Sequence, residues 1–195
     1  MEIITNILYW ISTGLLVPVI VFLLFFFIKA LIMIGGFYGS YVTRIKENAR
    51  INKSVDENNV IETLKNISTD KENRSSLSSH LMRITNHTEN PIMMDKIIGD
   101  YEIAADKELG QSKLLVKIGP MLGLMGTLIP MGPALVGLAA GDIESMANNM
   151  QVAFSTTVIG IIIGAIGYIT LQVKQRWVAY DINILEYVVQ SLKKH

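Results

Sequence analysis

The chain has 195 residues, half of them hydrophobic, and a formal net charge of zero, with a mean hydropathy of +0.39. It contains no cysteine, which excludes disulfide bonds and cysteine-ligated metal sites. The apolar residues gather in three stretches without any Asp, Glu, Lys, Arg or His: Ile3–Ile28, Ile118–Gly141 and Ser145–Val173. Each is long enough to cross a bilayer as a helix, which needs about 20 residues, so the pattern excludes a single soluble core.

The charges predict which way the chain crosses the membrane. All 17 Lys and Arg residues lie in residues 29–117 or 174–194. The first 28 residues carry one charged side chain, Glu2, and the connection between the second and third stretches carries only Asp142 and Glu144. Because Lys and Arg collect on the cytoplasmic side, we expect the N-terminus and this connection outside. The sequence thus predicts a multi-pass protein of the cell membrane, with its polar segments and C-terminus in the cytoplasm.

In chain order, the first region is residues 1–43, with a first span over roughly Ile7–Ile28. The apolar stretch Ala30–Tyr41 that follows contains three glycines. The helix therefore either continues as the inner end of a tilted span or bends at these glycines.

Residues 44–113 are polar, and we expect this cytoplasmic segment to be helical. Asn90 followed by Pro91 is typical of a helix start, because Asn caps the first turn and Pro lacks the N–H that this turn leaves unused. The helix that starts there should run directly into the second span, and the third span should continue as a cytoplasmic helix over 174–195. The helices expected in the polar segment cover about 55–67, 75–87 and 91–113.

The second and third spans, within residues 114–173, each carry a face of small residues and prolines. On the second span this face is Gly119, Gly123, Gly126, Pro130, Pro133 and Gly137, and on the third it is Ala153, Thr157, Gly160, Gly164 and Gly167. Steps of 3 and 4 keep each set on one side of a helix. Small faces let helix backbones approach closely in lipid, so they predict helix packing. The two prolines each remove a backbone hydrogen bond, which predicts a kink in the second span.

Hydroxyl side chains lie near the middle of these spans: Thr127 in the second, and Ser155, Thr156 and Thr157 in the third. A threonine in a membrane helix often bonds only the carbonyl four residues earlier, so packing alone can account for them. None of the three spans contains Asp, Glu, Lys, Arg or His, although proton carriers normally place such a side chain at membrane depth. The chain therefore cannot hold a titrating proton site within its spans by itself.

From about Gly119 to Lys174, the chain resembles the MotA–TolQ–ExbB proton-channel family. The segment GLMGTL at Gly123–Leu128 is similar to the G-L-x-G-T-hydrophobic motif of the family's penultimate span. The segment STTVIG at Ser155–Gly160 is similar to the A-T-x-x-G segment of its last span. Three spans with a large loop after the first resemble the ExbB/TolQ branch. Pro130 departs from the pattern, which usually has a small residue there.

The resemblance implies an all-α membrane protein that forms a pentameric ring. Such a ring surrounds the spans of a dimeric ExbD-, TolR- or MotB-like partner, whose membrane aspartate carries the ion. Ion flow then drives mechanical work. The resemblance places Thr127 and Thr157 at the channel lining, with Thr156 as the alternative one residue away. A smooth glycine face would suit a ring that slides past an inner helix. The implied ion is H⁺, with Na⁺ as the alternative, and no cofactor or metal is implied.

Several alternatives stay open at this point. Asp142 and Glu144 could raise the local cation concentration at an outer mouth, but a polar turn explains them more simply. A non-conducting membrane scaffold would use the same glycine-rich faces. A transporter is disfavoured because the spans show no internal repeat. An enzyme is not expected, because His80, His87 and His195 lack metal-ligand spacing and no phosphate-binding loop is present.

Overall fold

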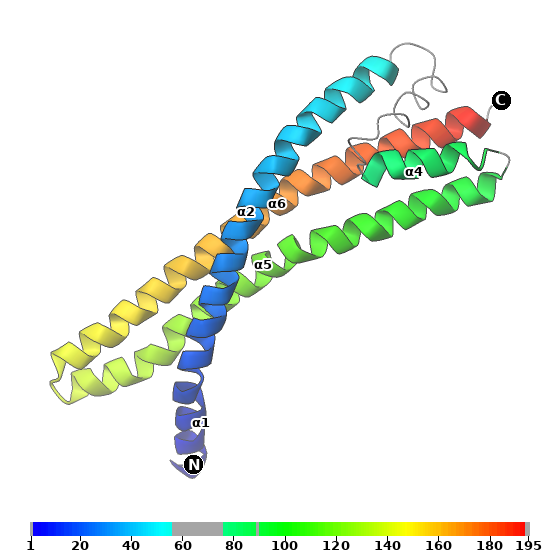
Figure 1. Ribbon diagram of the computed structural model, residues 1–195. Coiled ribbons are helices and arrows are strands. Elements are labelled where there is room, and N and C mark those ends of the chain that lie inside the picture. The colour runs from blue at the N-terminus through cyan, green and yellow to red at the C-terminus, as the bar shows by residue number, and fades with distance from the viewer. Residues whose placement is uncertain (1, 56–75, 89, 194–195) are drawn as a thin grey trace. The chain divides into compact units, whose positions relative to one another are not determined.

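The computed structural model describes residues 2–55, 76–88 and 90–193, and their regular structure is entirely helical. In chain order the helices are α1 (Glu2–Gly14), α2 (Leu16–Val55), α4 (Ser76–Thr85), α5 (Pro91–Ala139) and α6 (Ile143–Lys193) (Figure 1). The all-α class is confirmed, and so is the presence of three helical stretches long and apolar enough to cross a membrane. The helix expected at 55–67 falls almost wholly outside the described residues.

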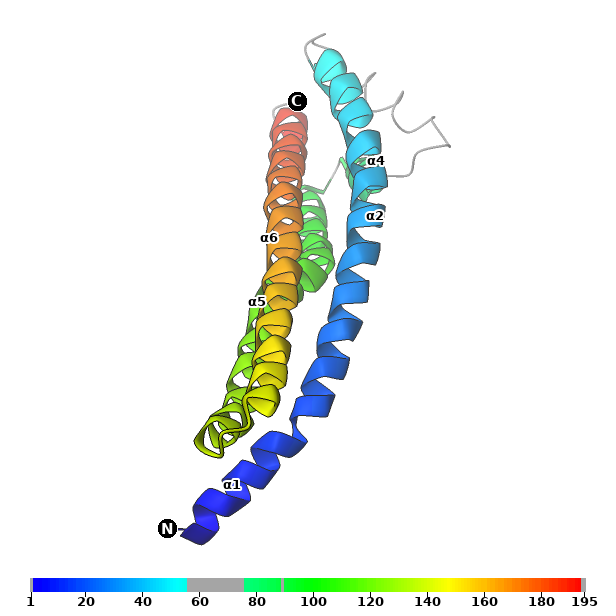
Figure 2. The same cartoon turned by 90° about the vertical axis from the view of Figure 1, so that its left-hand side faces the viewer.

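The first apolar stretch is two helices rather than the single one predicted, with a break at Leu15 (Figure 2). Gly14 is a poor helix former, and Pro18 has no N–H to donate to the Gly14 carbonyl. Ordinary hydrogen bonding resumes directly after the break, where the Val19 N–H donates to the Leu15 carbonyl at 3.0 Å. Gly14 and Pro18 together therefore account for the end of α1 at Gly14 and the start of α2 at Leu16.

Beyond this break α2 is one unbroken helix to Val55. It passes through Gly35, Gly36 and Gly39, and a Cβ atom added at any of them would meet nothing within 4 Å. The helix therefore continues past its glycines, as the sequence analysis expected.

The chain divides into two compact units. The first, here called the membrane unit, consists of Met1–Gly36 and Gln111–Leu171, and the second, the extension unit, consists of Phe37–Gly110 and Gln172–His195. The helices α2, α5 and α6 each contribute one part to each unit. The prediction that the second and third spans continue as helices into polar sequence is confirmed.

The start of α5 at Pro91 is also confirmed. Asn90 caps the helix, because its Oδ1 accepts a hydrogen bond from the Met93 N–H at 3.2 Å. The short helix α4 lies within the predicted range of 75–87.

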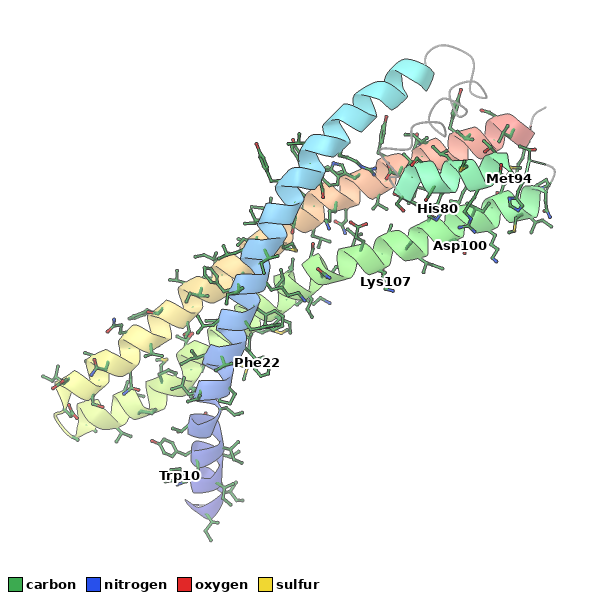
Figure 3. All side chains as sticks on the ribbon, in the orientation of Figure 1. Trp10, Phe22, His80, Met94, Asp100 and Lys107 are labelled. Carbon is green, nitrogen blue, oxygen red and sulfur yellow. The ribbon has the colours of Figure 1, made fainter. Side chains whose placement is uncertain are left out.

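The extension unit has its own hydrophobic core, formed by α4, α5 and α6. Figure 3 labels His80 on α4 and Met94 and Asp100 on α5. Apolar side chains at helical spacing point inward from each helix, and burying them holds together helices that are otherwise polar. The buried members of this core are Leu77, Leu81, Ile84, Met94, Ile97, Tyr101, Ala105, Ile184, Leu185, Val188 and Val189.

Candidate functional site

In the membrane unit, α5 and α6 pack against each other through their glycines. A Cβ atom added at Gly119 would lie 2.8 Å from the Gly160 carbonyl oxygen, and one at Gly160 would lie 2.7 Å from the Gly119 oxygen. One added at Gly167 would lie 2.8 Å from the backbone nitrogen of Val116. Side chains do not tolerate approaches this short, so only glycine allows the two backbones to come so close.

These contacts cover the small-residue faces of both spans. The buried members are Gly119, Gly123, Gly126, Pro130, Gly137, Ala153, Gly160, Gly164 and Gly167, while Pro133 is half-buried. The two faces therefore cover each other within one chain. They serve as a packing surface between α5 and α6, as their small residues predicted. The smooth face that would suit a sliding ring is covered here by the neighbouring helix of the same chain.

The same helix contact brings Thr127 and Thr157 together. Their Oγ1 atoms lie 2.6 Å apart, which is a hydrogen bond in which either atom can donate. Thr127 Oγ1 also lies 2.9 Å from the Gly123 carbonyl, and Thr157 Oγ1 lies 3.1 Å from the Ala153 carbonyl. Each hydroxyl has one proton and two lone pairs. The two hydroxyl protons are therefore fewer than the acceptors around them. Lone pairs on the threonine oxygens remain available to accept a further hydrogen bond.

Thr156 lies on a different side of α6. It is 5% exposed, and its hydroxyl donates to the carbonyls of Val152 and Ala153 at 3.0 and 2.9 Å. A Cβ atom added at Gly126 would lie only 2.6 Å from the Thr156 Cβ. Thr156 therefore fills the space over Gly126, and Thr157 is the residue that pairs with Thr127.

A second hydroxyl pair joins α5 and α6 further along the spans, and the sequence analysis missed it. Ser112 and Thr170 are both buried, and Thr170 Oγ1 lies 3.4 Å from Ser112 Oγ. Thr170 Oγ1 also lies 2.8 Å from the Ile166 carbonyl. Thr170 is three residues after Gly167 on the small-residue face of α6, and that position could have pointed to it.

Asp142 is placed as a helix cap. Gly141 has a φ angle of 77°, a left-handed conformation that ends α5, and the Asp142 N–H donates to the Gly137 carbonyl at 2.8 Å. Asp142 Oδ1 then accepts from the Ser145 N–H at 2.9 Å at the start of α6. Glu144 lies in the first turn, and both acidic side chains are exposed. The polar-turn alternative therefore accounts for Asp142.

The extension unit contains a buried charge cluster that the sequence analysis also missed. Asp181 is fully buried, and its Oδ2 accepts hydrogen bonds from the Arg44 guanidinium and the Tyr101 hydroxyl. Burial raises the pKa of Tyr101 well above its ordinary value, and the hydrogen bond to Asp181 raises it further. This cluster ties α2, α5 and α6 together. The available signal was an aspartate on the apolar face of α6, four residues before Leu185.

Comparison with known proteins shows the family to which this chain belongs. The model of the MotA/TolQ/ExbB proton channel family matches residues 52–186, which include the Thr127–Thr157 pair. A protein of Methanothermobacter thermautotrophicus, named as a biopolymer transport protein ExbB homologue, is 26% identical over 119 residues. That match covers 60% of this chain and 43% of the relative, so the chain spans less than half of the relative's length. No solved structure matches. Because the family model covers well over half of its residues, this chain belongs to the MotA/TolQ/ExbB proton channel family.

Proposed function

We propose that the chain is the ring-forming subunit of an ion-driven membrane motor of the ExbB/TolQ type. The observation that carries this proposal is the 2.6 Å contact between the Thr127 and Thr157 hydroxyls, in spans that contain no Asp, Glu, Lys, Arg or His. Hydroxyls do not titrate near neutral pH, but they exchange hydrogen bonds with a group that does. Membership in a proton-channel family supports the same function.

In this mechanism the titrating group is a carboxylate from a partner chain. A protonated carboxyl can donate to a free lone pair of the threonine pair, which favours the neutral form of the acid. After proton loss, a threonine hydroxyl can rotate away from its own helix carbonyl and donate to the carboxylate instead. When no carboxylate needs their protons, the hydroxyls of Thr127 and Thr157 can bond the carbonyls of Gly123 and Ala153 instead. The same site can therefore bind the partner's carboxyl group in its protonated and its ionised form.

The assembly that fits this mechanism is a pentameric ring around a dimeric ExbD-, TolR- or MotB-like partner with one membrane aspartate. The N-terminus and the α5–α6 turn face outside, and the polar helical extensions face the cytoplasm, as the charge distribution favours. The proposed ion is H⁺. The relative's name, which refers to biopolymer transport by an ExbB homologue, supports energy transduction of this kind.

The test replaces Thr127 or Thr157 by Val, which keeps the side-chain shape and removes the hydroxyl. With the partner coexpressed, we expect each variant to assemble normally and to lose at least about tenfold in proton flux into vesicles, the equivalent of about 1.4 kcal/mol. Thr156→Val is the matched control, because within the described part of the chain its hydroxyl bonds only the Val152 and Ala153 carbonyls of its own helix. Full flux in both Thr127→Val and Thr157→Val would contradict the role of the threonine pair.

A non-conducting scaffold is the second candidate, and the close glycine contacts between α5 and α6 favour it. It predicts that all three Thr-to-Val variants behave as wild type. It also predicts that Gly160→Leu, which cannot fit against Gly119, disrupts the complex. A flux measurement on the threonine variants therefore separates the two candidates.

A further inference from the structure

A cavity of about 480 Å³ lies between α2 and α6 within the membrane unit. Its volume falls in the range of roughly 300–1,000 Å³ that is typical of small-molecule sites. The wall formed by α2 is purely apolar and consists of Ile20, Leu23 and Leu24. Among the described residues, the cavity lining contains no Asp, Glu, Lys, Arg or His, so these residues do not select an occupant by charge.

The opposite wall, formed by α6, is mixed: Val152 and Ile159 are apolar, and the other lining residues of this helix are polar. Asn148, Gln151 and Ser155 lie on it at steps of 3 and 4, along one helical face. Ser155 is satisfied within its own helix, because its Oγ donates to the Gln151 carbonyl at 2.7 Å. The side-chain amides of Asn148 and Gln151 are exposed and form no hydrogen bond with the residues that the structure describes. Both amides are therefore available to hydrogen-bond a molecule outside this chain.

The depth of these amides narrows the choice of occupant. Asn148 and Gln151 follow the start of α6 at Ile143 by five and eight residues. At a rise of 1.5 Å per residue, they lie roughly 8 and 12 Å along the helix from that end. The hydrocarbon core is about 30 Å thick within a bilayer of about 40–45 Å, which puts this position at the border between headgroups and hydrocarbon. Glycerol-linked lipid oxygens lie at this border.

We propose that this cavity binds a membrane glycerolipid. Its glycerol-linked oxygens accept hydrogen bonds from the amide N–H groups of Asn148 and Gln151, and one hydrocarbon chain lies along the α2 wall. A water cluster would satisfy the amides but would leave Ile20 and Leu24 facing water. A glycerolipid matches both walls at once and needs no charged contact. The site requires only that the chain lies in a bilayer, so it can fail or succeed independently of the proposed motor function.

Native mass spectrometry of the full-length protein tests this proposal, with dioleoyl phosphatidylcholine as the probe lipid. We expect about one lipid per subunit to survive detergent washing in the wild type. The double variant Asn148→Leu/Gln151→Leu removes two hydrogen bonds and should weaken lipid binding by at least about tenfold. Ser155→Trp fills the cavity and should abolish retention. Phe154→Trp is the matched control, because Phe154 is 66% exposed beside the cavity without lining it, and it should retain the lipid.

Lipid retention equal to wild type in either cavity variant would overturn the proposal. Dissociation of the oligomer by Ser155→Trp, with no change in lipid count per subunit, would assign the cavity to a second copy of this chain and would also overturn it. Helicity measured by circular dichroism shows whether each variant folds. If Ser155→Trp does not fold, lipid retention by the Asn148→Leu/Gln151→Leu variant tests the proposal alone. This variant adds little side-chain volume, so we expect it to fold.

Discussion

Thr156 and Thr157 are neighbours in sequence, yet α6 points them at different parts of α5. Thr156 fills the space over Gly126, and Thr157 meets Thr127. The sequence motif narrowed the choice to these two threonines, because both fit the spacing of the third span. Only the packing of α6 on α5 distinguishes them, and that packing is set by where the glycines of one helix meet those of the other.

The glycine contacts predict a sharp difference between glycines that pack and glycines that do not. Gly160→Ala would put a Cβ atom 2.7 Å from the Gly119 carbonyl, so we expect it to lower the free energy of unfolding by about 1–3 kcal/mol. Gly99→Ala is the matched control, because a Cβ there meets nothing within 4 Å. The control should raise stability by a few tenths to about 1 kcal/mol, since alanine favours the helix. Thermal unfolding in mild detergent measures both, and equal stabilities would argue against the close approach of α5 and α6.

The raised pKa of Tyr101 predicts how the free energy of unfolding changes at alkaline pH. Its pKa is raised in the folded protein, so the native state keeps the hydroxyl proton above pH 10 while the unfolded chain loses it. The stability that this proton contributes is therefore complete below about pH 10, and it declines by up to about 1.4 kcal/mol per pH unit above it. Tyr101→Phe should lack this component of the slope between pH 10 and 11. Unfolding curves of wild type and variant across this range test it, and identical slopes would show that Tyr101 titrates normally.

At the scale of elements, helix ends explain features that hydrophobicity alone does not. The start of α5 at Pro91 was predictable, because the Asn90 cap is a local signal. The break between α1 and α2 was missed, although Gly14 and Pro18 are equally local, because an uninterrupted apolar run suggested one span. The turn before α6 combines a left-handed Gly141 with the Asp142 cap.

This turn allows the charge of Asp142 to be separated from its capping role. Asparagine caps a helix about as well as aspartate but carries no charge. If Asp142 serves only the turn, Asp142→Asn should leave both stability and proton flux unchanged. Asp142→Ala, which loses the cap, should cost about 1 kcal/mol of stability. A clear loss of flux in Asp142→Asn at wild-type stability would instead support a charged outer mouth.

At the scale of the whole molecule, the sequence predicted the class and the long helices because these depend on the length and composition of single segments. It did not predict contacts between distant residues. The cluster of Arg44, Tyr101 and Asp181 joins three helices, and no local pattern shows which cation reaches a buried aspartate. The contact between the two glycine faces was unpredictable for the same reason. Each face taken alone could pack against a helix of the same chain or of another chain.

The number of subunits is the last prediction, and it rests on the proposed function and the family resemblance. The glycine faces are used within the chain, and the threonine pair still lacks a titrating group. In the proposed ring of five subunits, a central partner supplies that group to the threonine pairs around it. Native mass spectrometry after mild extraction should therefore show five copies, with two copies of a single-span partner when it is coexpressed. The pentamer should persist in Thr127→Val, because this variant alters a hydroxyl and leaves the packing surfaces unchanged. A monomer or dimer that survives gentle extraction would contradict the ring and favour the scaffold.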